Sequence, residues 1–71
     1  MAQEAHEPIR IIRRKEVENR TGLRRSELYK RASAGTFPKQ IKLGGRRAVG
    51  WVESEVQAYL LSLIKQSRKV A

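Results

Sequence analysis

Two glycines thirteen positions apart, Gly22 and Gly35, place the strongest constraint on how this 71-residue chain can fold. Glycine readily adopts the left-handed backbone conformation with which many helices end. Between the two glycines, Leu28 and Ala32 are four positions apart and so face the same side of a helix. A helix this short, with so narrow an apolar stripe, is not stable alone and has to pack against other elements. The spacing predicts a helix over residues 25–34, preceded by a tight turn.

A shorter helix is expected immediately before that turn. Residues 14–20 run up to Thr21-Gly22, with Val17 as the inward residue. The apolar pattern of this segment is weak, so the assignment depends on the glycine stop and on the helix that follows. Two helices joined by a short turn containing glycine form a helix-turn-helix, whose second helix can enter the major groove of DNA.

After the second helix the pattern becomes extended. Pro38 ends any helix, because proline lacks the backbone donor and moves its predecessor out of the α region. Residues 39–43 alternate polar and apolar side chains as a half-buried strand does, and residues 48–51 form a returning strand. The Gly-Gly-Arg-Arg connection of residues 44–47 makes this hairpin resemble a DNA-contacting wing. A plain structural hairpin with solvated arginines is the alternative.

The clearest helical pattern covers residues 53–66. Ser54 and Gln57 fit a capping box at its start, and Leu61 lies off its apolar stripe and is expected to be exposed. We expect this helix to cover the hairpin and the back of the helix-turn-helix. The apolar residues of the stripe recur at helical spacing: Val56, Tyr59, Leu60, Leu63 and Ile64.

The remaining apolar residues suggest one central anchor. Trp51 is the only tryptophan, and it is expected in the core, with base stacking as the alternative. Ile12 is the expected core contact of a short extended segment at residues 9–12. The predicted organisation is a disordered leader over residues 1–8, one domain over residues 9–66 and a frayed tail over residues 67–71.

The positive charge of the chain is concentrated. The net charge is +9, and residues 10–47 hold 13 of the 16 lysines and arginines with only three acidic residues. Crowded positive charge repels itself, and a polyanionic partner is a common reason for it. A merely solvated basic surface is the alternative.

The chain offers little material for catalysis. It has no cysteine and no aspartate, its one histidine (His6) is in the predicted leader, and its glutamates are dispersed. We therefore expect no enzyme activity, no cofactor and no metal site. No run is long and apolar enough for a membrane span or a signal peptide, so a cytoplasmic, nucleoid-associated bacterial protein is expected.

Several short stretches, in order and with similar spacing, resemble the AlpA family of phage and prophage transcriptional regulators, within the wider MerR-like and excisionase-like group. They are Lys15-Glu16-Val17, Thr21-Gly22-Leu23, Arg25-Ser26 with Leu28-Tyr29, Gly35-Thr36-Phe37-Pro38, Ile41-Lys42-Leu43-Gly44, and Ala48-Val49-Gly50-Trp51 with Glu53-Ser54-Glu55-Val56.

The resemblance implies an α+β, mostly α, small winged helix-turn-helix that binds double-stranded DNA near a phage attachment or promoter site. Family members activate an integrase or excision gene, or act as recombination directionality factors. One position departs from the family pattern: Arg24 stands where a serine commonly caps the second helix, and arginine cannot accept the backbone N–H bonds of a cap.

The DNA contacts that follow from this arrangement fall into two sets. Base edges would be read by Arg25, Ser26, Tyr29 and Lys30, since the arginine fork matches guanine O6 and N7. Phosphates, or the minor groove beside the wing, would be contacted by Arg14, Arg24, Arg31, Arg46 and Arg47.

Three other interpretations remain open at this point. An excisionase-like factor would use the same surface to bend DNA, and a basic RNA-binding protein would use Tyr29 for stacking. A protein-interaction adaptor would use Leu61 and the outer face of the last helix. Expected partners are DNA, a second or adjacent copy of the chain, because one short helix reads few bases, and a recombinase or RNA polymerase.

Overall fold

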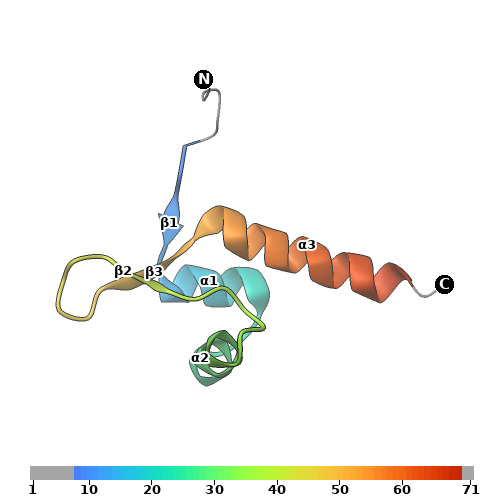
Figure 1. The fold of residues 1–71 in the computed structure, drawn as a ribbon, viewed down its shortest axis with the longest axis horizontal. Helices are drawn as coiled ribbons and strands as arrows, with labels where there is room; N and C mark the ends of the chain where they lie inside the picture. The colour runs from blue at the N-terminus through green and yellow to red at the C-terminus, as the bar shows by residue number, and fades with distance from the viewer. Residues whose placement is uncertain (1–7, 70–71) are drawn as a thin grey trace.

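The computed structural model describes residues 8–69, so most of the predicted leader (residues 1–7, with His6) and the end of the predicted tail (residues 70–71) lie outside the described residues. The fold is α+β and mostly helical, as predicted (Figure 1). In chain order the elements are β1 (Ile11–Ile12), α1 (Arg14–Thr21), α2 (Arg25–Ala34), β2 (Ile41–Lys42), β3 (Val49–Val52) and α3 (Glu53–Lys69).

The three strands form one antiparallel sheet in the order β1-β3-β2. The predicted hairpin is present, with Ile41 opposite Gly50. Its first strand is shorter than the predicted residues 39–43, and its second has the predicted length but begins one residue later. On the other side of β3, Ile12 lies opposite Trp51. The sheet therefore joins the start of the chain to the hairpin through its central strand.

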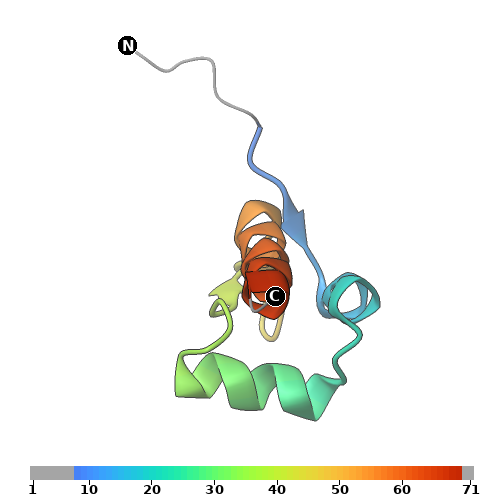
Figure 2. The same cartoon turned by 90° about the vertical axis from the view of Figure 1, so that its right-hand side faces the viewer.

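The helix-turn-helix has the predicted bounds for its second helix, Arg25–Ala34. Gly22 ends α1 at φ 78° and Gly35 ends α2 at φ 84°, both in the left-handed region that favours glycine. Within the turn, the Leu23 N–H donates to Thr21 Oγ1 at 3.1 Å. In the view along α3, α2 crosses beneath that helix (Figure 2). The arrangement is consistent with a winged helix-turn-helix.

Trp51 is in the core, as predicted, and is fully buried. Its indole Nε1 donates to the carbonyl oxygen of Pro38 at 2.9 Å, and its ring lies 5.9 Å from that of Tyr29 between centroids. Leu28 of α2 and Val17 of α1 are fully buried in the same cluster. Packing against this cluster stabilises α2, because the apolar stripe of α2 is too narrow to keep an isolated helix folded.

Two predictions about burial were wrong. Ile41 and Leu43 are 38% and 37% exposed rather than half-buried, because β2 is an edge strand and the last helix packs on β3. In α3, only Val56 is buried, whereas Leu63 and Ile64 are 43% and 45% exposed. The helix covers the body with its first half only, and its second half extends beyond it (Figure 1).

The bounds of α3 also differ from the prediction. The helix begins at Glu53, so Ser54 lies in its first turn rather than at its cap, and the Glu53 N–H donates to the Arg10 carbonyl at 2.8 Å. It continues through Lys69, beyond the expected end at residue 66. Leu61 is 50% exposed, as predicted. Among the described residues, none of the helices combines the length and apolar character that crossing a bilayer requires.

Gly50 in the central strand is expected to be intolerant of any side chain. A Cβ at this position would lie 2.5 Å from Ile11 Cγ2 and 3.0 Å from the Ile12 carbonyl oxygen, and the backbone atom cannot easily move. Overpacking of this kind destabilises by about 1–3 kcal/mol, so Gly50→Ala should lower the free energy of unfolding measured in urea by that amount. Gly45→Ala is the control, because its nearest neighbour is Ala48 of the same loop. Equal stability of the two variants would contradict this account of β3.

Candidate nucleic-acid interface

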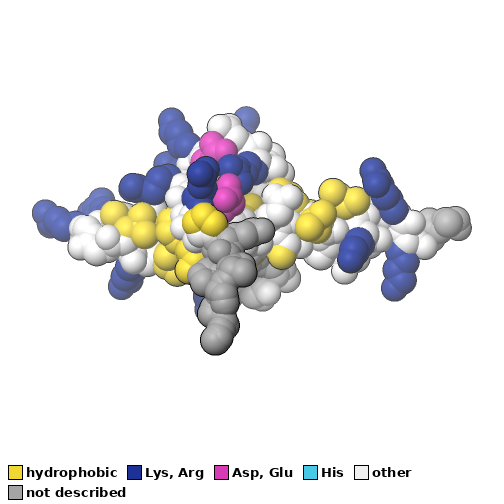
Figure 3. All heavy atoms as spheres, turned by 90° about the horizontal axis from the view of Figure 1, so that it is seen from above, with side chains coloured by type: hydrophobic (Ala, Val, Ile, Leu, Met, Phe, Trp, Pro, Cys, Tyr) yellow, Lys and Arg dark blue, Asp and Glu magenta, His cyan; other side chains and the backbone are white. Residues whose placement is uncertain are grey.

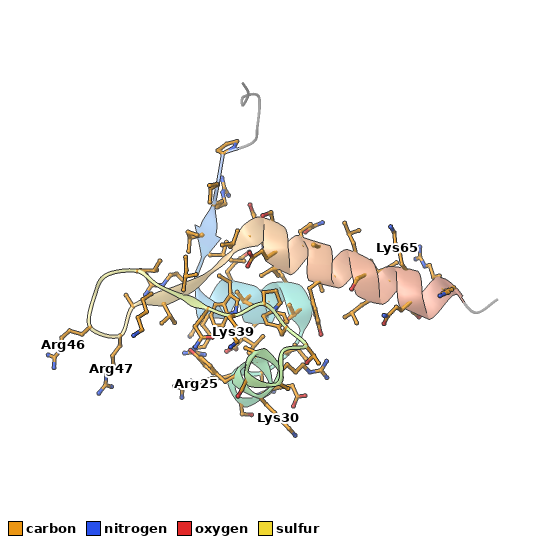
Figure 4. All side chains as sticks on the ribbon, in the orientation of Figure 1. Arg25, Lys30, Lys39, Arg46, Arg47 and Lys65 are labelled. Atoms are coloured by element: carbon orange, nitrogen blue, oxygen red, sulfur yellow. The ribbon has the colours of Figure 1, made fainter. Side chains whose placement is uncertain are left out.

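The outer side of α2 carries most of the predicted base-reading residues. Because Leu28 and Ala32 face the core, Arg25, Ser26 and Lys30 are exposed. Figure 4 shows Arg25 and Lys30 projecting from α2 away from the body, on the side toward which Arg46 and Arg47 also point from the loop after β2. The helix and the loop therefore present their cations on one side of the molecule.

Tyr29, the fourth predicted base reader, has a different position. Its ring is half-buried and packs on the core beside Trp51. The guanidinium carbon of Arg25 lies over the same ring, 5.7 Å from the centroid. A cation over an aromatic face is attracted by the ring quadrupole. Tyr29 therefore links the core to the arginine at the start of α2.

Four of the five carboxylates within residues 8–69 pair with arginines, and Glu55 is the exception. The paired arginines are Arg10, Arg14, Arg20 and Arg31. Arg14 donates to Glu18 at 2.6 Å, and Arg20 donates to both Glu16 at 2.8 Å and Glu53 at 2.7 Å. The carboxylates of Glu16 and Glu53 raise the pKa of Arg20, which stays charged. Neutralised in this way, these arginines contribute less to the positive potential of the surface than unpaired ones do.

A second group of cations has no carboxylate within 4.0 Å among residues 8–69. Seven of them lie on or beside α1 and α2 and on the loop between β2 and β3: Arg13, Lys15, Arg24, Arg25, Lys30, Arg46 and Arg47. The other five lie at and before β2 and in the second half of α3: Lys39, Lys42, Lys65, Arg68 and Lys69. Of the six arginines that lack a carboxylate partner within residues 8–69, five therefore lie around the starts of α1 and α2 or on the loop.

A notch lies where the start of α1, the first turn of α2 and the loop meet. Five cations and no acidic residue line it, together with two partly buried residues, Tyr29 and Val49. The cations are Arg13, Arg14, Lys15, Arg25 and Arg47. The N-terminal end of α1 adds the partial positive charge of its unpaired N–H groups. This is an anion-binding arrangement by charge.

The structure brings most of the predicted residues together. Arg14, Arg25 and Arg47 share the notch, and an adjoining hollow is lined by Arg24 and Ser26 beside them. The exposed arginine Arg46 extends from the loop, and Lys30 lies further along α2 (Figure 4).

Arg31 lies apart from this group. Its guanidinium donates to Glu27 at 2.9 Å and to the Tyr59 hydroxyl at 3.1 Å, so it is directed toward α3. The carboxylate of Glu27 and the hydroxyl of Tyr59 raise the pKa of Arg31. This arginine ties the far flank of α2 to the last helix.

Sequence reasoning missed three residues of this surface. Arg13 and Lys15 line the notch, and Lys39 lines a hollow beside Tyr29 and Ser33 of α2. The first two belong to a run of three cations at the start of the first helix, residues 13–15, which is visible in the sequence. For Lys39 no sequence signal was available, because its position depends on how the chain returns from α2 to the sheet.

The face seen from above in Figure 3 differs in character. Acidic side chains gather near its centre, and apolar side chains lie along α3 and the sheet among scattered cations. This mixed surface lies opposite the side toward which Arg25 and Lys30 project (Figures 3 and 4). Within residues 8–69 there is no group of three or more His, Cys, Asp or Glu that could hold a metal ion.

Comparison with known proteins gives two matches. A family model described as "Prophage CP4-57 regulatory protein (AlpA)" matches residues 10–63, which include the notch, α2 and the loop. The protein "Uncharacterized protein ORF88" of Enterobacteria phage P4 is 42% identical over 55 residues. That alignment covers 78% of this chain and 61% of the phage protein, so the chain spans less than two thirds of that relative's length. No solved structure matches significantly.

The unpaired cations should destabilise the fold by mutual repulsion. Arg13→Gln with Arg47→Gln removes two of them from the notch, one at the unfavourable positive end of a helix, and should raise Tm by about 1–4 °C at low salt. The increase should shrink as salt screens the charges. Arg20→Gln is the control with opposite sign, because this arginine is ion-paired and its loss should lower Tm. Thermal unfolding followed by circular dichroism measures both. A lower Tm for the double variant would show that the cluster does not repel itself.

Proposed function

The chain belongs to the AlpA family of prophage regulatory proteins, and from this premise we propose that it is a transcriptional regulator that binds double-stranded DNA sequence-specifically. The observation that carries the proposal is the convergence of unpaired cations from α1, α2 and the β2–β3 loop on one side of the molecule. A convergent set of cations matches the phosphates on both sides of a DNA groove, whereas scattered cations would not.

In this proposal α2 lies in the major groove. Its ten residues are about 15 Å long, and a helix fits a groove about 12 Å wide. Arg25 is the principal base reader, because its guanidinium is exposed and is held by the ring of Tyr29. Ser26 and Lys30 would reach neighbouring bases, and the partly buried Tyr29 would act mainly by orienting Arg25.

The phosphate contacts would come from both sides of α2. The notch would seat one phosphate between Arg13 and Lys15 on one side and Arg47 on the other, with Arg46 and Arg24 on neighbouring phosphates. Arg14 would contribute less than its position suggests, since Glu18 already accepts from it. We assign Arg31 to holding α2 against α3 rather than to a phosphate.

Two alternatives use the same surface differently. RNA binding is disfavoured, because Tyr29 is the best candidate for base stacking and its ring is packed beside Trp51. An excisionase-like factor that bends DNA would show induced bending and cooperative filling of adjacent sites in gel assays. A regulator that reads a single operator would show neither.

The specificity of the proposed contact can be tested once a binding site is known. Selection of bound duplexes from a random pool should return a defined sequence that contains guanine at the position read by Arg25. Arg25→Ala should then weaken binding to that site by about 10- to 100-fold, with a much smaller effect on random DNA. Lys65→Ala, on the part of α3 that points away from the interface, is the matched control (Figure 4). Equal losses on both DNAs would make Arg25 a phosphate contact, and recovery of no preferred sequence would overturn the proposal.

The role of the loop can be measured separately from specificity. Each lost phosphate contact reduces the slope of log K against log salt by about 0.9, so Arg46→Ala with Arg47→Ala should reduce it by up to about 1.8. Lys65→Ala with Lys69→Ala removes the same charge from α3 and should leave the slope unchanged, as should Arg31→Gln. An unchanged slope in the loop variant would exclude Arg46 and Arg47 from the interface, and a reduced slope for Arg31→Gln would restore that arginine as a phosphate contact.

A further inference from the structure

A second hollow lies beside α2, toward the end of the helix that is away from the notch, and the DNA contacts assigned above leave it unused. It is lined by Tyr29, Ala32 and Ser33 of α2 and by Lys39 and Gln40 of the segment that leads to β2. These residues include one cation, a hydroxyl and an amide, and no acidic group. The hollow therefore offers an anion a positive charge and neutral hydrogen-bond donors.

The hollow and the notch lie along the same side of α2. Arg25, Tyr29 and Ser33 are four positions apart, so they form a row on one face of the helix. Arg25 lines the notch, Ser33 lines the hollow, and Tyr29 between them lines both. The two depressions are therefore parts of one groove that follows α2, and we call it the α2 groove.

The opposite wall of the α2 groove comes from the chain that follows the helix. Arg47 and Val49 form this wall at the notch, and Lys39 and Gln40 form it at the hollow. Lys39 lies between α2 and the sheet (Figure 4). The groove thus has cations at both ends, with the half-buried ring of Tyr29 between them.

Lys39 is available to bind an anion. Its side chain is exposed, and no carboxylate lies within 4.0 Å of it among residues 8–69. Glu55 and Lys39 both border another hollow, on the side of α3, but they form no ion pair there. Arg31, in contrast, is held by Glu27 and Tyr59. Lys39 is therefore the unpaired cation at this end of the groove.

The helix dipole makes the two ends of the groove different. The start of a helix attracts anions, whereas its last turn carries partial negative charge and repels them. Ser33 is in the last turn of α2, so an anion beside it requires a neighbouring cation. At this end Lys39 supplies that charge without help from other cations of the hollow.

The length of the groove suits the spacing of phosphates. From Arg25 to Ser33 the helix advances by eight residues, which is about 12 Å. Each strand of B-DNA carries one phosphate per about 3.4 Å of the duplex axis. Two phosphates roughly three nucleotides apart on one strand therefore match the two ends of the groove.

We propose that Lys39 is a further DNA contact and that the α2 groove holds one strand of the duplex, with one phosphate in the notch and a second at Lys39. The Lys39 ammonium binds the second phosphate, and the Ser33 hydroxyl and the Gln40 amide donate to its oxygens. The inference rests on the proposed binding of duplex DNA. It does not depend on sequence specificity, because phosphate contacts carry no sequence information.

The contact can be tested by the salt dependence of binding to any duplex. Lys39→Ala should reduce the slope of log K against log salt by about 0.9, so that raising salt from about 50 to 200 mM costs the variant about 3.5-fold less affinity than the wild type. Lys39→Arg keeps the charge and should keep the slope. Lys65→Ala removes the same charge from α3 and is the matched control, and circular dichroism confirms that each variant folds (Figure 4).

The outcomes separate this inference from the proposed function. Equal slopes for Lys39→Ala and Lys65→Ala would overturn the role of Lys39 alone, provided that the wild type binds duplex DNA. A wild-type protein that binds no duplex would overturn the proposed function and this inference together.

Combining variants tests whether two different phosphates are bound. Separate sites have additive effects, so Lys39→Ala with Arg47→Ala should reduce the slope by about 1.8, twice the effect of either change alone. A combined reduction no larger than that of one variant would show that both residues contact the same phosphate, and would overturn the proposal.

The strand can be identified with duplexes in which a methylphosphonate replaces one charged phosphate by a neutral group. Each neutral position that weakens wild-type binding marks a contacted phosphate. Lys39→Ala should lose its sensitivity at one position, and Arg13→Gln with Arg47→Gln should lose it at another, roughly three nucleotides away on the same strand. Positions on opposite strands would overturn the proposal that the groove holds a single strand.

Discussion

The burial of one indole ring holds the parts of this small domain together. Trp51 stands on the central strand, donates to the Pro38 carbonyl in the segment between α2 and β2, and packs beside Tyr29 of α2. Its side chain therefore connects the sheet, the second helix and the return segment at once. Because large aromatic residues bury the most apolar area, a domain of this size depends on such a residue more than a larger one would. The direction of α2, and with it the position of Arg25, follows from this contact.

Ion pairs determine how charge is distributed over the surface of this domain. Four glutamates engage arginines, three of them one helical turn apart, and Glu53 crosses from α3 to α1. Exposed pairs of this kind contribute little to stability. Their larger effect is on the pattern of charge, because they neutralise Arg20 and Arg31, which lie away from the notch, while within residues 8–69 four of the five cations that line the notch stay unpaired and only Arg14 is engaged. The positive charge of the chain is therefore most concentrated on the side of the notch, while the opposite face mixes acidic, apolar and scattered basic side chains.

The sequence was sufficient to predict those features that single residues or short spacings determine. Gly22 and Gly35 fixed the bounds of α2, and the Gly-Gly-Arg-Arg connection indicated the hairpin. Burial that depends on elements distant in sequence could not be predicted. Ile41 belongs to a strand whose alternate residues are apolar, but no other element packs over this residue. Ile64 continues the apolar stripe of α3 beyond the part of the helix that packs on the rest of the domain. Arg31 could not be separated from Lys30 by sequence, since only the position of Tyr59 on another helix shows where its guanidinium is held.

The residues at the starts of α1 and α2 are unfavourable for the stability of these helices. Both N-cap positions, Arg13 and Arg24, hold an arginine without a side-chain capping bond, where Ser, Thr, Asn or Asp would add about 1 kcal/mol. A cation there also opposes the positive end of the helix dipole. An anion at each start would accept from the free N–H groups there and neutralise the arginine beside it. If the proposed DNA contact is made, the same two residues that weaken the isolated domain become stabilising contacts to phosphates, and binding would then stabilise the fold.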